Sequence, residues 1–129
     1  MTNFKKLVII TTHALIGWAL CGAIIGIGFQ VTSVENTLII HALGVPIIFV
    51  LVSLVYFNRF DYTTPLQTAI IFTASAILLD FFIIALLVNK SFEMFTSIIG
   101  TWIPFASIFL STYLVGLYTQ ARAKTTTVA

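Results

Sequence analysis

Asp80 is the residue whose type and surroundings most strongly suggest chemistry. It is the only carboxylate in the apolar run AILLDFFIIALL, residues 76–87. An ionisable side chain inside such a run is costly in a membrane, so by default it faces the protein interior and has a partner there. We therefore expect Asp80 to be a protonatable centre, with His41 as its partner.

Other polar and aromatic residues are expected at a depth similar to that of Asp80. Depth follows from counting about 1.5 Å per residue from the middle of each apolar stretch. The candidate protonatable or ligand-binding site comprises Asp80, His41, Thr101, Cys21 and Trp102. A second layer, on the other side of the midplane, comprises His13, Ser111 and Tyr113. Trp18 and Trp102 lie within apolar stretches, so each indole N–H needs an acceptor.

The same residues do not favour a metal, a haem or a catalytic centre. A structural zinc site needs four ligands, whereas this layer offers at most His41, Asp80 and Cys21. His13 and His41 differ in depth by about 16 Å on helix rise, too far to bind one haem iron. An HExxH motif, a second intramembrane aspartate and a Gly-rich phosphate loop are missing. We therefore expect no metal and no cofactor, and a non-enzymatic role is favoured.

The elements that carry these residues are predicted to be membrane-spanning helices. Of the 129 residues, 60% are hydrophobic and 8% charged, against roughly 25% charged residues in soluble domains. Crossing a bilayer takes roughly 20 apolar residues, and the chain has four such stretches, at about 7–29, 37–57, 65–88 and 94–119. We predict an all-α fold in which residues 1–129 form a single integral membrane domain. Short loops make it an antiparallel four-helix bundle, and we expect the polar tail, residues 121–129, to lack regular structure.

Basic residues predict the orientation of the bundle. Lys and Arg in short loops favour the cytoplasmic side. One side of the four-span arrangement carries five of them: Lys5, Lys6, Arg59, Arg122 and Lys124. Lys90 alone falls on the other side. We therefore expect both termini in the cytoplasm and the protein in a lipid bilayer, namely a prokaryotic cytoplasmic (inner) membrane. The net charge of +2 comes with no basic, aromatic-rich patch, so nucleic acid is not an expected partner.

Local motifs predict where helices start and where they bend. The segment TTPLQ places Thr64 as N-cap, Pro65 in the first turn and Gln67 in a capping box. Pro46 and Pro104 each remove a backbone hydrogen bond and predict kinks. The fourth helix is expected to deviate in GTWIPF, residues 100–105.

Gly22 and Gly26 form a GxxxG step in the first stretch. Small residues at this spacing let two membrane helices approach closely. We expect this face to support a homo-oligomer or contact with a partner subunit in the membrane.

Three functions are compatible with these features. The leading hypothesis is permeation or proton-coupled transport of a small solute or ion, with Asp80 as the protonatable group. A second hypothesis is binding, with or without isomerisation, of a hydrophobic ligand inside the bundle. A third is that the chain is an accessory subunit of a larger membrane complex, in which Asp80 bonds to a partner helix.

Overall fold

The computed structural model describes residues 3–88, 96 and 98–128. These residues form the helices α1 (Asn3–Val31), α2 (Val34–Arg59), α3 (Pro65–Leu79) and α4 (Ile103–Val128), with the π-helices η1 (Asp80–Val88) and η3 (Ile98–Trp102). No strand occurs in this described part. The predicted all-α fold is therefore confirmed.

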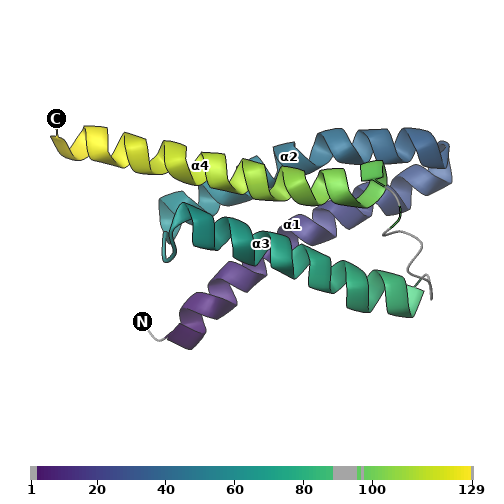
Figure 1. Ribbon diagram of the computed structural model, residues 1–129, viewed down its shortest axis with the longest axis horizontal. Coiled ribbons are helices and arrows are strands. Elements are labelled where there is room, and N and C mark those ends of the chain that lie inside the picture. Colours follow the sequence, from purple (N-terminus) through teal and green to yellow (C-terminus); the bar gives the residue numbers. More distant parts are fainter. Residues whose placement is uncertain (1–2, 89–95, 97, 129) are drawn as a thin grey trace.

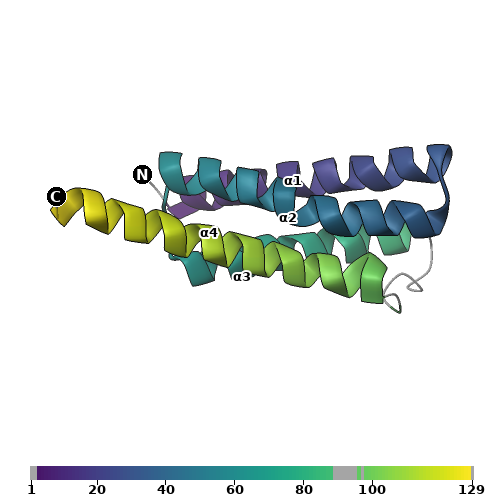
Figure 2. The ribbon, with the colours of Figure 1, turned by 90° about the horizontal axis from the view of Figure 1, so that it is seen from above.

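Consecutive α-helices run in opposite directions, and the start of α1 lies at the same end as the end of α4 (Figures 1 and 2). We call this the terminal end, and the opposite one the distal end. In Figure 1, α1 crosses α3 at an angle, and η1 continues α3 away from α1 toward the distal end. The first and third helices therefore pack near their crossing and diverge beyond it.

Three helical segments of the described chain are long and apolar enough to cross a membrane: Phe4–Val31, Val34–Arg59 and Pro65–Leu87. They correspond to the first three predicted spans, and they are consistent with an integral membrane protein. α4 is not among them. Hydroxyl side chains such as Ser107, Ser111 and Thr112 lower its mean hydropathy. Part of the predicted span 94–119 also lies outside the described residues.

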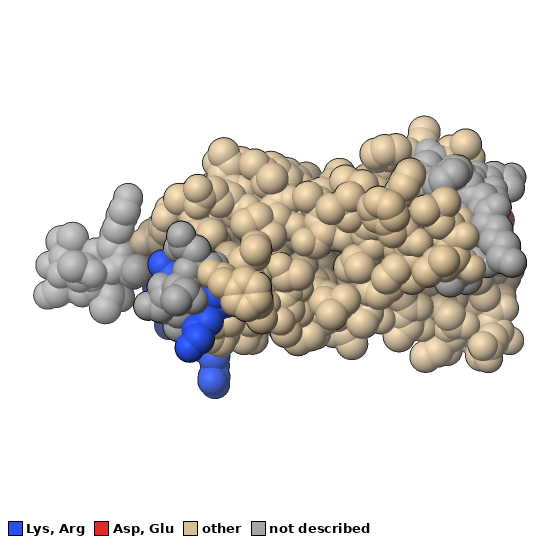
Figure 3. Space-filling view, turned by 90° about the horizontal axis from the view of Figure 1, so that it is seen from below, with Lys and Arg blue, Asp and Glu red and all other residues tan. Residues whose placement is uncertain are grey.

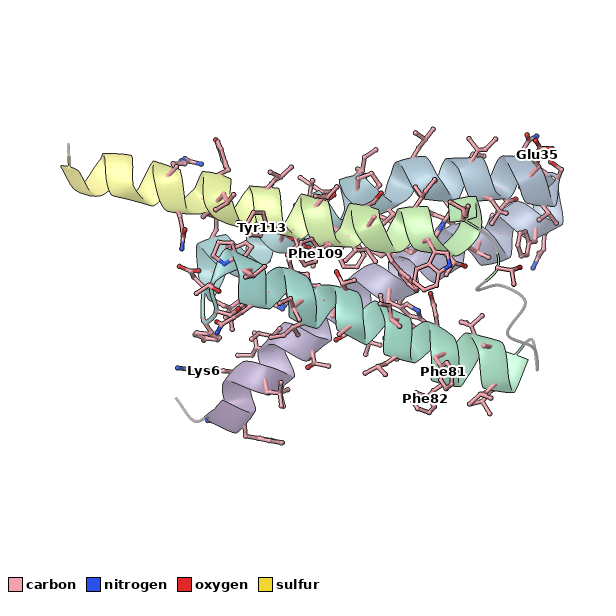
Figure 4. All side chains as sticks on the ribbon, viewed as in Figure 1. Lys6, Glu35, Phe81, Phe82, Phe109 and Tyr113 are labelled. Atoms are coloured by element: carbon pink, nitrogen blue, oxygen red, sulfur yellow. The ribbon has the colours of Figure 1, made fainter. Side chains whose placement is uncertain are left out.

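The described basic residues lie at the terminal end. Lys5 and Lys6 are in the first turns of α1, Arg59 ends α2, and Arg122 is near the end of α4. Figure 3 shows Lys and Arg side chains gathered at this end on the face it draws, and Figure 4 places Lys6 and Glu35 at opposite ends. Lys90 and the side chain of Lys124 lie outside the described residues.

Helix starts follow the local signals. Thr64 Oγ1 accepts from the Gln67 backbone N–H at 3.2 Å, and Gln67 Oε1 accepts from the Thr64 N–H at 3.1 Å. Pro65 takes the first turn, as predicted. At α2, Ser33 Oγ accepts from the Asn36 N–H at 3.1 Å. Such caps satisfy N–H groups that have no partner within the helix.

The chain departs from regular α-helix at two places in the distal half, directly after α3 and directly before α4. η1 begins at Asp80, and η3 ends at Trp102, just before Pro104. The deviation expected in residues 100–105 is therefore present, and Pro104 lies in the first turn of α4, where a proline is tolerated. α2 runs through Pro46 as one helix. α4 continues to Val128, so the expectation that the tail lacks regular structure is not met.

The terminal half has an aromatic core. Phe49, Tyr56 and Phe72 are each 0% exposed. The ring centroids of Phe49 and Phe72 lie 6.1 Å apart, and those of Tyr56 and Phe72 lie 5.9 Å apart. This packing closes the terminal half of the bundle.

Candidate functional site

A cavity of about 470 Å³ lies in the distal half, between all four α-helices and the two π-helices. Trp18 and Cys21 reach it from α1, His41 from α2, Asp80 from the start of η1 and Thr101 from η3. Most of the remaining wall is aliphatic or aromatic: Ile25, Phe29, Val34, Leu38, Val45, Phe49, Ile84, Phe105 and Ile108. Pockets of this volume and character typically hold small organic molecules.

Asp80 accepts a hydrogen bond from the Trp18 indole. The Trp18 Nε1 to Asp80 Oδ1 distance is 2.7 Å. A neutral N–H donor satisfies one acceptor position of the carboxylate but does not balance its charge. Asp80 is therefore a carboxyl group in a largely apolar cavity, and none of the described side chains that line this cavity with it is a Lys or Arg.

His41 lines the same cavity, but it is not hydrogen-bonded to Asp80. The side chain is 8% exposed, and its Nδ1 atom is buried without a hydrogen-bond partner. Trp18 thus takes the place that the sequence analysis assigned to His41. Asp80 and His41 nonetheless line one cavity.

The other candidate residues divide into two groups. Cys21 and Thr101, which are 6% and 2% exposed, line the cavity together with Pro104. Trp102 is 48% exposed and does not line it. The Trp102 ring instead packs edge-on against Phe105, with centroids 5.8 Å apart.

The second predicted layer is not assembled around His13. The His13 Nδ1–H donates to the Ile9 carbonyl at 2.8 Å, and its ring packs edge-on against Tyr56 and Phe60 at centroid distances of 5.5 and 5.2 Å. Tyr113 stacks on Phe109 along α4, with centroids 6.2 Å apart (Figure 4). Ser111 is buried. His13 is thus a packed, hydrogen-bonded residue of the aromatic core.

Gly22 and Gly26, both on α1, line the cavity. Both are exposed, and a Cβ atom added to either would have no atom within 4 Å. They make no close helix contact within this chain. Gly17, one turn earlier, behaves differently, because an added Cβ would lie 2.6 Å from Phe49 Cζ.

Sequence reasoning missed Trp18 as a site residue. The signal was present, since a tryptophan far from the membrane interface must find an acceptor for its N–H. The strongest acceptor available at that depth is Asp80. In the described chain, no group of three His, Cys, Asp or Glu side chains comes close enough to hold a metal ion.

Comparisons with known proteins found no matching family model, no similar curated protein and no similar solved structure.

Proposed function

We propose that this protein binds a small hydrophobic molecule in its distal cavity, with Asp80 as the polar anchor. The observation that carries the proposal is the cavity itself: about 470 Å³, mostly apolar, with one carboxyl group held in place by Trp18. Ligand pockets combine an apolar wall with a few fixed polar groups that orient the ligand. Nothing in the arrangement calls for a reaction, so binding is the function that it supports best.

Proton-coupled transport or permeation of a small solute or ion is the second proposal. It rests on the protonatable Asp80 beside a cavity. It also needs a path through the terminal half, where Phe49, Tyr56 and Phe72 are each 0% exposed. A carrier would have to open this aromatic core, which makes binding the simpler function. An accessory-subunit role is a third proposal, and it would require a partner chain against the cavity side.

The binding proposal can be tested with a brominated alcohol, because bromine quenches indole fluorescence on contact. Trp102→Phe leaves Trp18 as the sole tryptophan. In phosphatidylcholine nanodiscs, ω-bromodecanol should quench Trp18 saturably. The control carries its only tryptophan at the lipid-exposed position 20, through Leu20→Trp with Trp18→Phe and Trp102→Phe, and should be quenched in proportion to the probe in the bilayer. Identical, non-saturating curves for the two proteins would refute a binding cavity.

We also propose four spans with both termini cytoplasmic, in the inner membrane of a prokaryote. Support comes from the described basic residues Lys5, Lys6, Arg59 and Arg122, which all lie at the terminal end, as expected for the cytoplasmic side. Association into a homo-oligomer, or with a membrane partner, through Gly22 and Gly26 is part of the same proposal, because this face is exposed.

A further inference from the structure

Asp80 has unused hydrogen-bonding capacity at the cavity, and His41 lines the same cavity from another element. The Asp80 carboxylate can accept several hydrogen bonds, and among the described residues Trp18 alone donates to it. His41 is 8% exposed, and its buried Nδ1 atom has no hydrogen-bond partner among the residues that the structure describes. Buried polar atoms are nearly always hydrogen-bonded, so an exception calls for a missing partner. Asp80 lines the cavity, so a ligand held there can supply the donors that its carboxylate lacks.

The free positions are suited to a hydrogen-bond donor. A carboxylate only accepts hydrogen bonds. An anionic ligand would face the Asp80 charge in an apolar cavity. A hydroxyl group has a single donor and no charge. An ammonium group has donors for more than one acceptor and also balances the carboxylate, and charge-assisted hydrogen bonds are the stronger kind.

The remaining wall suits the rest of such a molecule. Phe29, Phe49 and Phe105 add aromatic surface to the wall of the cavity. Aromatic faces attract cations and also bury hydrocarbon. A ligand with an ammonium head and a hydrocarbon body would therefore use both parts of the cavity.

We propose that the ligand class of the cavity is a hydrophobic amine, bound with its protonated amino group on Asp80 and its hydrocarbon part against the apolar wall. This inference rests on the proposed binding function and specifies its chemistry. The same ammonium chemistry is offered by a free hydrophobic amine and by the head group of phosphatidylethanolamine.

The test compares two short probes that differ only in the head group, 2-(3-bromophenyl)ethylamine and 2-(3-bromophenyl)ethanol, whose bromine stays close to a head group bound at Asp80 and therefore close to Trp18. An alkylamine with a pKa of about 10.4 is protonated at neutral pH. Quenching of Trp18 is measured in the Trp102→Phe protein in phosphatidylcholine nanodiscs, since this lipid has no N–H donor. Probe concentrations in the bilayer are matched using the position-20 tryptophan control described above. The amine should bind at least about tenfold more tightly than the alcohol, as expected for a charge-assisted hydrogen bond.

Two substitutions of Asp80 provide the decisive comparison. Asp80→Asn keeps an acceptor for the Trp18 N–H but removes the charge, so the preference for the amine should fall to within about twofold. Asp80→Glu keeps the charge and should keep the preference. Equal affinities for amine and alcohol in the unaltered site would overturn the amine proposal while leaving hydrophobic binding intact. Saturable binding of neither probe would overturn the binding function itself.

A final comparison distinguishes the two sources of the ammonium group. In nanodiscs rich in phosphatidylethanolamine, a head group that occupies the cavity should compete with 2-(3-bromophenyl)ethylamine and weaken its binding. Unchanged amine binding would assign the site to a free amine. Both results support an ammonium ligand. If phosphatidylethanolamine weakens amine binding equally in the Asp80→Asn protein, the competition does not involve Asp80, and its proposed role is contradicted.

Discussion

At the scale of single residues, the polar side chains of Asp80 and His41 both line the cavity. They differ in whether their polar atoms have hydrogen-bond partners. Asp80 is held by Trp18 at 2.7 Å, whereas His41 Nδ1 has no partner. An unpaired buried polar atom costs about 1–3 kcal/mol. The unpaired Nδ1 atom of His41 is therefore expected to lower the stability of the folded protein.

Replacing His41 by an apolar residue of similar size should stabilise the ligand-free protein. His41→Leu is expected to raise the free energy of unfolding by about 1 kcal/mol, because the unpaired atom is removed. The matched control is His13→Leu, since His13 Nδ1–H donates to the Ile9 carbonyl at 2.8 Å and that bond would be lost. Thermal unfolding in detergent measures both. A lower stability for His41→Leu would show that Nδ1 is satisfied.

Asp61 is a residue whose backbone requires a particular side chain. Its φ angle is +50°, in the left-handed region that Asp and Asn tolerate and β-branched residues avoid. Asp61→Val should lower the free energy of unfolding by about 1–2 kcal/mol, and Asp61→Asn should leave it nearly unchanged. Chemical denaturation in mixed micelles measures the difference. Equal stability of the two variants would mean that the loop adopts another conformation.

At the scale of helices, glycines on α1 have two distinct roles. Gly17 lies where α1 packs on Phe49 of α2, and Gly22 lies where α1 borders the cavity. Close approach of two helices requires the absence of a side chain at Gly17 but not at Gly22. The helix itself would prefer alanine at both.

The two glycines should therefore respond to alanine in opposite directions. Gly17→Ala places a Cβ 2.6 Å from Phe49 Cζ and should cost about 1–3 kcal/mol, because Phe49 is fully buried and cannot move aside easily. Gly22→Ala meets no atom within 4 Å and should gain about 0.5–1 kcal/mol from the helix backbone. Thermal unfolding of both variants in one detergent makes the comparison. A shift of the same sign in both would contradict this packing.

At the scale of the whole molecule, α1 and η1 diverge toward the distal end (Figure 1), and the cavity in that half is lined in part by the exposed Gly22 and Gly26 of α1. A hydrophobic ligand could enter there from the bilayer without opening the aromatic core. The same exposed face could instead bind a second copy of the chain.

Bulky side chains at Gly22 and Gly26 can distinguish an entrance for the ligand from an interface with another protein chain. Gly22→Leu with Gly26→Leu should slow modification of Cys21, the sole cysteine, by N-ethylmaleimide in membranes. Ala23→Leu is the control, because Ala23 is exposed on the same helix but does not line the cavity. An unchanged rate combined with conversion of an oligomer to a monomer, followed by mass measurement in detergent, would make this face a protein interface.

The orientation of the bundle gives a prediction for both ends of the chain. Reporter domains fused to the N-terminus and to the C-terminus should both report the cytoplasm, because the described basic residues cluster at the terminal end of the bundle and basic residues favour the cytoplasmic side. A signal from the opposite side at the C-terminus alone would mean an odd number of spans.

Helix positions, caps and depth could be predicted because they depend on neighbouring residues. The Thr64 capping box formed as expected, the deviation before Pro104 is present, and Asp80, His41, Cys21 and Thr101 line one cavity. Each follows from helix rise, apolar length or local hydrogen bonding.

Which side chains meet could not be predicted in the same way. Trp18 and Asp80 are 62 residues apart, and their contact depends on how α1 is rotated and how it crosses α3. The exposed position of Trp102, the aromatic neighbours of His13 and the open side at Gly22 depend on the same two quantities. A helical sequence determines which residues share a face, but nearly every face of these helices is apolar. The choice among them is made by side-chain packing between helices, at positions such as Gly17 and Phe49, and therefore only in the tertiary structure.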